Sequence, residues 1–196
     1  MADLFPMLLA ALALMGSPGP ATMSCTAMGA AYGWRRALPY VAGIMAGTGT
    51  VTLMIAAGIT GLLLAIPGAR IVLVAGGTAY ILYLAWKIAT APPLERSTDH
   101  VQAPGFFAAW LFGIANPKAY AAVGSVYAGF TLVPDNLPLD SVAKIGVLFA
   151  VNAFVNPTWM MVGSGLSRYF QSPRASRILN WVFASLLIVS VVFAFL

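Results

Sequence analysis

The chain has 196 residues, of which 61% are hydrophobic and 8% charged, and its mean hydropathy is +0.90. A soluble domain carries about a quarter charged residues, so the composition indicates an integral membrane protein with no separate soluble domain. The net charge of +5 does not indicate a nucleic-acid partner, because most basic residues lie in or beside short segments between apolar runs.

Six apolar runs are each long enough to cross a hydrocarbon core of about 30 Å as a helix. In chain order they cover residues 4–28, 39–66, 69–90, 104–132, 142–166 and 178–196. The sequence therefore predicts an all-α integral membrane protein with six transmembrane helices. The first run is too long and lacks the basic start that a cleaved signal peptide needs.

Basic residues are distributed unevenly among the segments that join these runs. The segments after the first, third and fifth runs, with their margins, hold Arg35, Arg36, Lys87, Arg96, Arg168, Arg174 and Arg177, whereas the alternate segments hold only Arg70 and Lys144. The positive-inside rule therefore places the first set in the cytoplasm and both termini outside.

One polar stretch divides the chain into halves. Residues 91–103 form a predicted cytoplasmic linker between a first three-helix unit, residues 1–90, and a second, residues 104–196. Because three is an odd number of crossings, two such halves enter the membrane in opposite orientations. The predicted architecture is a pair of inverted-topology three-helix repeats, a geometry that many secondary transporters share.

Proline motifs interrupt the first and fourth runs near their middles. Pro18-Gly19-Pro20 and Asn116-Pro117-Lys118 occupy corresponding places in the two halves. A proline inside a helix frees the carbonyl four residues earlier, here the carbonyls of Leu14, Gly16 and Gly113. Broken helices at membrane depth are tolerated where they line an enclosed site, although a simple kink is the alternative for either motif alone.

Side chains near these breaks offer partners for the freed carbonyls. Ser17, Thr22, Ser24 and Asn116 can hydrogen-bond there, and the helices that begin after each break present N–H groups suited to an anionic ligand. We therefore expect a midplane site between the two breaks.

Lys118 lies far from both ends of its run, where ionisable side chains are rare and commonly functional. Every acidic residue falls in a joining segment or at the margin of a run, so no buried carboxylate partner is evident. Lys118 can bind backbone carbonyls and be structural, bind a carboxylate of a substrate, or lose its proton in the apolar interior and exchange protons.

The fifth run contains a further polar pattern. Asn152 and Asn156 lie four residues apart and share one helix face, where they either join helices or line a polar path. Pro157 predicts a third break, and Trp159 is read as core packing. In the second run, Gly43, Gly47 and Gly49 allow another helix to approach closely.

These motifs together resemble the LysE/RhtB superfamily of bacterial amino-acid exporters. The matching features are SPGPATM in the first run, GAAYGWRRALPYVAGIMAGTG leading into the second, GGTAYILYLAWK closing the third, and GIANPKAY in the fourth. The resemblance implies six spans, a homodimer in the bacterial inner membrane, and efflux of amino acids driven by the proton motive force, as an antiporter. It places the family's motifs on Pro18, Gly19 and Pro20 and on Asn116, Pro117 and Lys118.

The sequence therefore predicts a secondary exporter of a neutral, zwitterionic amino acid or derivative, because no span offers an acid to a cationic side chain. The candidate substrate-binding residues are Pro18, Gly19, Pro20, Thr22, Asn116, Pro117, Lys118, Asn152 and Asn156. We expect the lipid bilayer, an amino acid and protons as partners, and no nucleic acid, cofactor or metal site.

Two other functions remain as alternatives. One is transport of another small solute or a cation, although the spans hold no cluster of Cys, His and carboxylate ligands for a transition metal. The more remote one is a membrane-embedded enzyme with Ser164 as nucleophile. The only histidine, His100, lies in the linker, so we assign no catalytic residue.

Overall fold

The computed structural model describes residues 3–58, 68–90, 103–169 and 173–195, and every regular element within these ranges is a helix. In chain order the helices are α1 (Leu4–Gly16), α2 (Pro20–Ala56), α4 (Ala69–Ala89), α5 (Phe106–Ala115), α6 (Pro117–Gly129), α7 (Leu137–Tyr169) and α8 (Pro173–Phe195). The prediction of an all-α protein is confirmed for this part of the chain.

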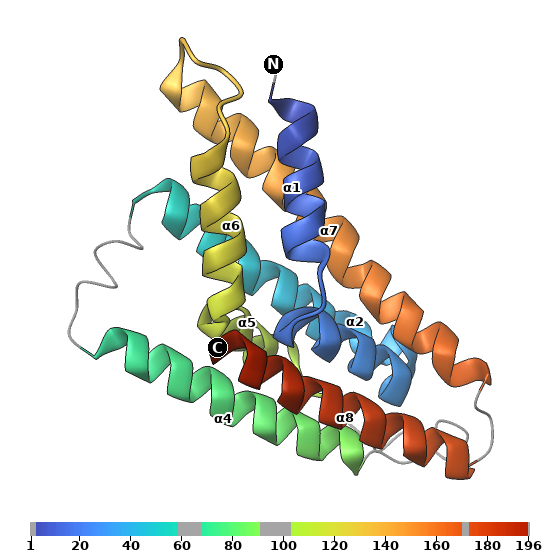
Figure 1. Cartoon of the computed structure of the whole chain (residues 1–196). Coiled ribbons are helices and arrows are strands. Elements are labelled where there is room, and N and C mark those ends of the chain that lie inside the picture. Colours follow the sequence, from blue (N-terminus) through green and yellow to red (C-terminus); the bar gives the residue numbers. More distant parts are fainter. Residues whose placement is uncertain (1–2, 59–67, 91–102, 170–172, 196) are drawn as a thin grey trace.

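Two long helices form the centre of the fold. Helix α2 has its most extensive contacts with α7 and with the short helix α5. Helices α1 and α6 stand side by side, α1 packs on α7 and α6 packs on α2, while α4 and α8 pair along one edge of the bundle (Figure 1). The α4–α8 pair contacts α2 chiefly through α8.

Both predicted proline breaks are confirmed. Helix α1 ends at Gly16 and α2 begins at Pro20, with extended backbone at Ser17 and Gly19. Helix α5 ends at Ala115 and α6 begins at Pro117. A proline is well placed at the first position of a helix, since its missing N–H would have no intrahelical acceptor there. Each motif therefore starts a new helix.

Two other sequence expectations are wrong. The joining segment expected at residues 29–38 is helical, and only Gly33, with φ 74° and ψ 158°, leaves the helical conformation inside α2. Glycine adopts this region because it has no Cβ, so one residue suffices for the turn. The break expected at Pro157 does not occur, because α7 runs through it from Leu137 to Tyr169.

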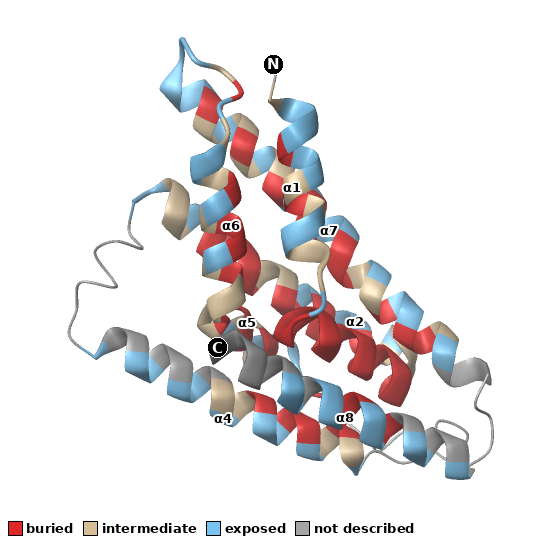
Figure 2. Ribbon diagram, in the orientation of Figure 1, coloured by how far each residue is buried: buried red, intermediate tan, exposed pale blue. Residues whose placement is uncertain are grey.

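The buried apolar side chains form two clusters. The α2 cluster comes mainly from α2 with additions from α4, α5 and α7, and includes Met28, Tyr40, Ile44, Leu84, Ile88, Phe112 and Met160. The α6 cluster joins α1, α6 and α7, and includes Met7, Ala11, Val123, Val126, Leu148, Val151 and Val155. Figure 2 shows the buried first half of α2 at the centre of the molecule.

Glycines on α2 set its distance from α5. A Cβ added at Gly43 would lie 2.3 Å from the Phe106 carbonyl oxygen, and one added at Gly47 would lie 2.4 Å from that of Trp110. The predicted close approach of another helix is confirmed, and the neighbour is α5. This contact fixes the half of α2 after Gly33 against the helix that leads into the second break.

The outer surface is strongly apolar. Large apolar side chains on several helices face outward, and Phe5, Ile71, Trp86 and Trp181 are each at least 60% exposed. By length and apolarity, the described segments Pro20–Ala56 and Leu137–Leu166 are long enough to cross a membrane, and Leu4–Gly16 and Phe106–Ala115 are shorter apolar helices. Six spans and two repeats stay predictions, and linker residues 91–102 lie outside the described ranges.

Candidate functional site

A pocket lies where the two broken helices meet α7, at the junction of the two apolar clusters. Residues from α1, both halves of α2, α6 and α7 contribute to it, together with the residue between α5 and α6. Its lining residues are Met15, Ala21, Thr22, Thr48, Asn116, Lys118, Ala119, Ala122, Val123, Asn152, Val155 and Asn156. We call this cavity the central pocket.

The central pocket offers about 40 Å³ to water, whereas a single water molecule needs about 10–15 Å³. A few waters therefore fit, and an amino acid enters only after lining side chains move. Lys118 is the charged residue among its lining residues, and no acidic or histidine side chain is among them. The electrostatic character of the pocket thus favours a ligand that carries a negative group.

The side chain of Lys118 joins the two helix breaks. Its ammonium group donates to the backbone carbonyl of Ser17 and lies 3.4 Å from the carbonyl oxygen of Pro18. Of the roles that the sequence leaves open for Lys118, binding to backbone carbonyls is therefore observed in this conformation. Lys118 is also a lining residue of the central pocket, so its flexible side chain can turn toward a ligand there.

Gly19 leaves the space through which the Lys118 side chain passes. A Cβ added at Gly19 would lie 2.5 Å from Cδ and 2.9 Å from Nζ of Lys118. The Gly19 backbone is extended, with φ −174°, so its conformation alone does not require glycine. The requirement comes from Lys118, and Gly19 shapes the site without lining the pocket.

Thr22 closes the start of α2. Its hydroxyl accepts a hydrogen bond from the Gly19 N–H at 2.9 Å and lies 3.3 Å from the Ser17 carbonyl oxygen. On the other broken helix, the Asn116 side-chain oxygen accepts from the Lys118 N–H at 3.1 Å. Both breaks are thus capped by a polar side chain that also lines the central pocket.

The first break frees two carbonyls, as predicted. The Ser17 hydroxyl donates to the Leu14 carbonyl at 2.9 Å, and the Trp159 indole N–H donates to the Gly16 carbonyl at 3.0 Å. Ser17 is one of the partners that the sequence suggested, whereas Trp159 was read as core packing alone. Trp159 also packs against both apolar clusters, so it holds the end of α1 to the middle of α7.

Asn152 and Asn156 combine the two roles that the sequence left open. Asn152 donates to the Met45 carbonyl at 2.9 Å and so joins α7 to α2. Asn156 donates to the Asn152 side-chain oxygen at 2.7 Å, and both amides are buried and line the central pocket. They present a hydrogen-bonded polar wall of the pocket on α7.

The structure brings five of the nine candidate residues into the pocket lining: Thr22, Asn116, Lys118, Asn152 and Asn156. The other four, Pro18, Gly19, Pro20 and Pro117, form the breaks that position them. Sequence reasoning missed Thr48 and Met15, which also line the pocket. Thr48 lies between Gly47 and Gly49. The glycine spacing indicates close packing of another helix against this segment, but it does not indicate that Thr48 lines a pocket.

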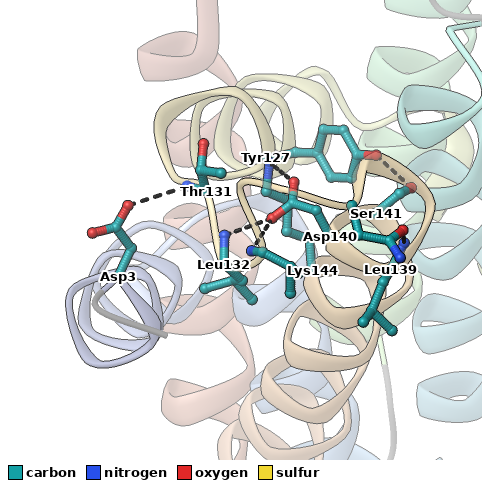
Figure 3. Close-up of polar contacts among 10 residues, drawn as sticks. Asp3, Tyr127, Thr131, Leu132, Leu139, Asp140, Ser141 and Lys144 are labelled. Atoms are coloured by element: carbon teal, nitrogen blue, oxygen red, sulfur yellow. Dashed lines mark hydrogen bonds and ion pairs between the residues drawn. The ribbon is translucent and has the colours of Figure 1, made fainter.

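A second polar cluster lies at the turn between α6 and α7 (Figure 3), and none of the residues labelled there lines the central pocket. Asp140 is buried, accepts from the Val133 N–H at 2.9 Å and pairs with Lys144 at 2.7 Å. The Asp3 carboxylate accepts from the Thr131 N–H at 3.2 Å. This cluster fastens the α6–α7 turn to the beginnings of α1 and α7.

Comparison with known proteins bears on what this arrangement does. The model of the LysE type translocator family matches residues 12–196. The chain belongs to that family. This LysE type translocator is therefore a membrane transport protein and not an enzyme, and the resemblance seen in its motifs is confirmed.

Relatives of this LysE type translocator match over most of their length. The cysteine/O-acetylserine efflux protein of Klebsiella pneumoniae subsp. pneumoniae is 32% identical over 174 residues, which cover 88% of this chain and 86% of the relative. The protein of the same name from Escherichia coli strain K12 is 32% identical over 176 residues, 88% of this chain and 87% of the relative. No solved structure matches the chain.

Proposed function

We propose that this translocator exports a small neutral amino acid or derivative across the bacterial inner membrane, with Lys118 as the residue that receives the substrate carboxylate. The observation that carries this proposal is the position of Lys118, which is a lining residue of the central pocket and whose ammonium contacts backbone carbonyls at the other helix break. The similar proteins are named for efflux of cysteine and O-acetylserine, both zwitterions without net charge.

An exchange of partners explains why a zwitterion suits this site. The substrate carboxylate replaces the carbonyls of Ser17 and Pro18 as the partner of Lys118. The substrate ammonium then occupies the carbonyls that Lys118 has left. The exchange conserves charge, and each group keeps a partner of opposite polarity, as burial requires. A cationic substrate side chain would find no acid among the lining residues.

The position of the central pocket supports an alternating-access mechanism. The pocket lies between the α2 cluster and the α6 cluster, so each cluster can close one side of it. The two helix breaks supply the flexible points at which half-helices move. We include in the proposal six spans, inverted repeats of residues 1–90 and 104–196, both termini outside, and a homodimer.

Proton influx is the proposed driving force. Lys118 is the ionisable side chain that the pocket offers, so it is the candidate proton carrier in the absence of substrate. In that role it would lose a proton to one side when no carboxylate is bound and regain one from the other side. Transport without any dependence on an imposed pH gradient would contradict this part of the proposal.

The test is transport in proteoliposomes with a panel of amino acids. Cysteine, O-acetylserine, threonine and homoserine should exchange in counterflow, whereas lysine and arginine should not. Lys118→Met should reduce the rate of this exchange by at least about tenfold. This factor corresponds to the free energy of one hydrogen bond to a charged group. Lys87→Met is the matched control, since Lys87 lies over the Tyr83 ring on α4 and is not a lining residue. Exchange of lysine or arginine alone, or normal transport by folded Lys118→Met, would overturn the proposal.

A further inference from the structure

Three buried tyrosine hydroxyls have no partner in normal hydrogen-bond geometry among the described residues, those of Tyr40, Tyr80 and Tyr120. The first two lie close to each other in the apolar interior. Tyr40 of α2 is fully buried within the α2 cluster, and Tyr80 of α4 packs against that cluster. The hydroxyl oxygens of both are inaccessible and unpaired. Buried polar atoms nearly always have a partner, so this pair requires an explanation that packing alone does not give.

The tyrosine pair continues inward from the central pocket. The Cys25 thiol lies 3.7 Å from the side-chain oxygen of Asn156, which lines the pocket. Tyr40 lies beside Cys25, Ser24 and Tyr80, although its hydroxyl does not reach hydrogen-bond geometry with them. Cys25 and Tyr40 thus extend the polar lining of the pocket toward α4.

The contacts of α2 indicate which interface can open there. On the α7 side the backbones are in direct contact, since a Cβ added at Gly29 would lie 2.1 Å from the Met160 carbonyl oxygen and one at Gly163 would lie 1.9 Å from that of Thr26. On the α4 side α2 has few contacts, and the main partner of α4 is α8. Separation of α4 from α2 therefore disturbs the least packing.

Tyr40 and Tyr80 come from the two sides of this weaker interface. Tyr40 lies soon after the Gly33 turn, near Arg35 and Arg36, and so belongs to the face of the molecule that carries those arginines. Tyr80 stacks on Phe112 with ring centroids 5.1 Å apart. Tyr40, Tyr80 and Phe112 belong to or pack against the α2 cluster, so they fill the α2–α4–α5 contact in the conformation described.

We propose that the hydroxyls of Tyr40 and Tyr80 line the arginine-bearing half of the translocation path, which opens when α4 separates from α2. The proposal rests on the proposed function and names the residues that a zwitterion meets between the central pocket and that membrane face. A tyrosine hydroxyl both donates and accepts, so it can bind the substrate carboxylate through its proton and the substrate ammonium or water through its oxygen. In the conformation described, in which α4 contacts α2 and the path is closed, the hydroxyls lack such partners.

Removal of each hydroxyl tests this role against a structural one. Tyr40→Phe and Tyr80→Phe each remove a hydroxyl that has no partner in normal hydrogen-bond geometry in the conformation described, so the melting temperature should change little. Counterflow of cysteine should slow by about tenfold, because the open path loses a polar partner of a charged group. Tyr83→Phe is the control, since Tyr83 lies on the same helix with its side chain exposed. Normal transport by both variants would overturn the proposal. So would slower transport that is accompanied by a clearly lower melting temperature, because the hydroxyls would then have a structural role.

Thiol labelling gives a second measurement that does not require transport. Cys25 is the only cysteine in the chain and is fully buried, so a membrane-impermeant methanethiosulfonate reagent reports opening beside the tyrosines. Labelling should be faster from the face that bears Arg35 than from the opposite face. Tyr80→Trp, which adds bulk at the α2–α4 interface, should slow it several-fold, and Tyr83→Trp should not.

The two measurements distinguish failure of this inference from failure of the proposed function. Labelling that is faster from the opposite face, or unaffected by Tyr80→Trp, overturns the inference even if the protein exports amino acids. If no amino acid exchanges but labelling follows the stated pattern, the path is supported and the substrate class is wrong. If Tyr80→Trp does not fold, the transport rate of Tyr80→Phe, which keeps the ring and removes only the hydroxyl, decides the inference.

Discussion

The Lys118 ammonium donates to the Ser17 carbonyl, 101 residues earlier in the chain. This contact joins the break between α1 and α2 to the break between α5 and α6. A substrate carboxylate that attracts Lys118 must therefore also change what holds the two broken helices together. In the proposed function, one side chain thus couples substrate binding to helix movement.

Gly19→Ala tests how closely this coupling depends on the position of Lys118. The added methyl group would meet the flexible end of the lysine side chain at 2.5 Å from Cδ, while the extended backbone accepts alanine without strain. We expect the protein to fold normally and the half-saturation concentration of substrate to rise about tenfold or more, the value of a displaced charged hydrogen bond. Transport kinetics and a melting curve provide the two readouts.

Gly16→Ala is the matched control in the same break. A Cβ at Gly16 would lie 3.7 Å from Val155, an ordinary contact distance, and would leave Lys118 in place. Its transport kinetics should resemble those of the unmodified protein. An equal effect of both substitutions would show that the break tolerates no added volume, and would contradict a specific role of Gly19 toward Lys118.

Trp159→Phe should destabilise the protein by removing the donor to the Gly16 carbonyl. That bond is 3.0 Å long, and Trp159 is half-buried between the two clusters. The bond is part-buried, so the cost of leaving the carbonyl without a partner should lie toward the lower end of the range of about 1–3 kcal/mol for a buried group, and it should appear as a lower melting temperature. Trp86→Phe is the control, because Trp86 is 63% exposed. Equal melting temperatures for the two variants would show that water replaces the indole at the Gly16 carbonyl.

The parts of the site that follow from local chemistry could be predicted from the sequence. The breaks at Pro18 and Pro117 could be predicted because each proline belongs to a local motif, Pro18-Gly19-Pro20 or Asn116-Pro117-Lys118, at corresponding places in the two halves. Proline alone does not decide, since α7 continues through Pro157. Residues four apart share a helix face, so the common orientation of Asn152 and Asn156 also follows from spacing. The cap of Asn116 on the Lys118 N–H belongs to the same class, since it spans two residues.

The parts that depend on packing could not be predicted. Trp159 meets Gly16 across 143 residues, and nothing near either residue indicates the other. Packing also explains two places where the sequence predicted an interruption and the structure has a helix, at Pro157 in α7 and around Gly33 in α2. A long helix packed on its neighbours keeps its course through one missing hydrogen bond, and a single glycine turns the chain where the sequence indicated a ten-residue connection.

The polar cluster at the α6–α7 turn predicts a structural effect that is separate from the central pocket. Asp140→Asn removes the charge that pairs with Lys144 and weakens the acceptor for the N–H groups of Leu132 and Val133. We expect a lower melting temperature, with little change in substrate affinity at temperatures where the protein is folded. In a double-mutant cycle, Lys144→Met should have a smaller effect in the Asp140→Asn background than alone. Additive effects would show that the pair contributes nothing beyond its separate contacts.

Gly33→Ala should destabilise the turn that separates the two halves of α2. Gly33 has φ 74° and ψ 158°, a region that is essentially restricted to glycine and costs other residues on the order of 1–3 kcal/mol. The substituted chain either carries this strain or straightens, and straightening would separate the first half of α2 from Met160 and the second half from α5. We expect a lower melting temperature in detergent and a smaller folded fraction after purification. Gly146→Ala is the control, since a Cβ there meets nothing within 4 Å and alanine favours the helix. A Gly33→Ala protein as stable as Gly146→Ala would show that the positive φ is not required.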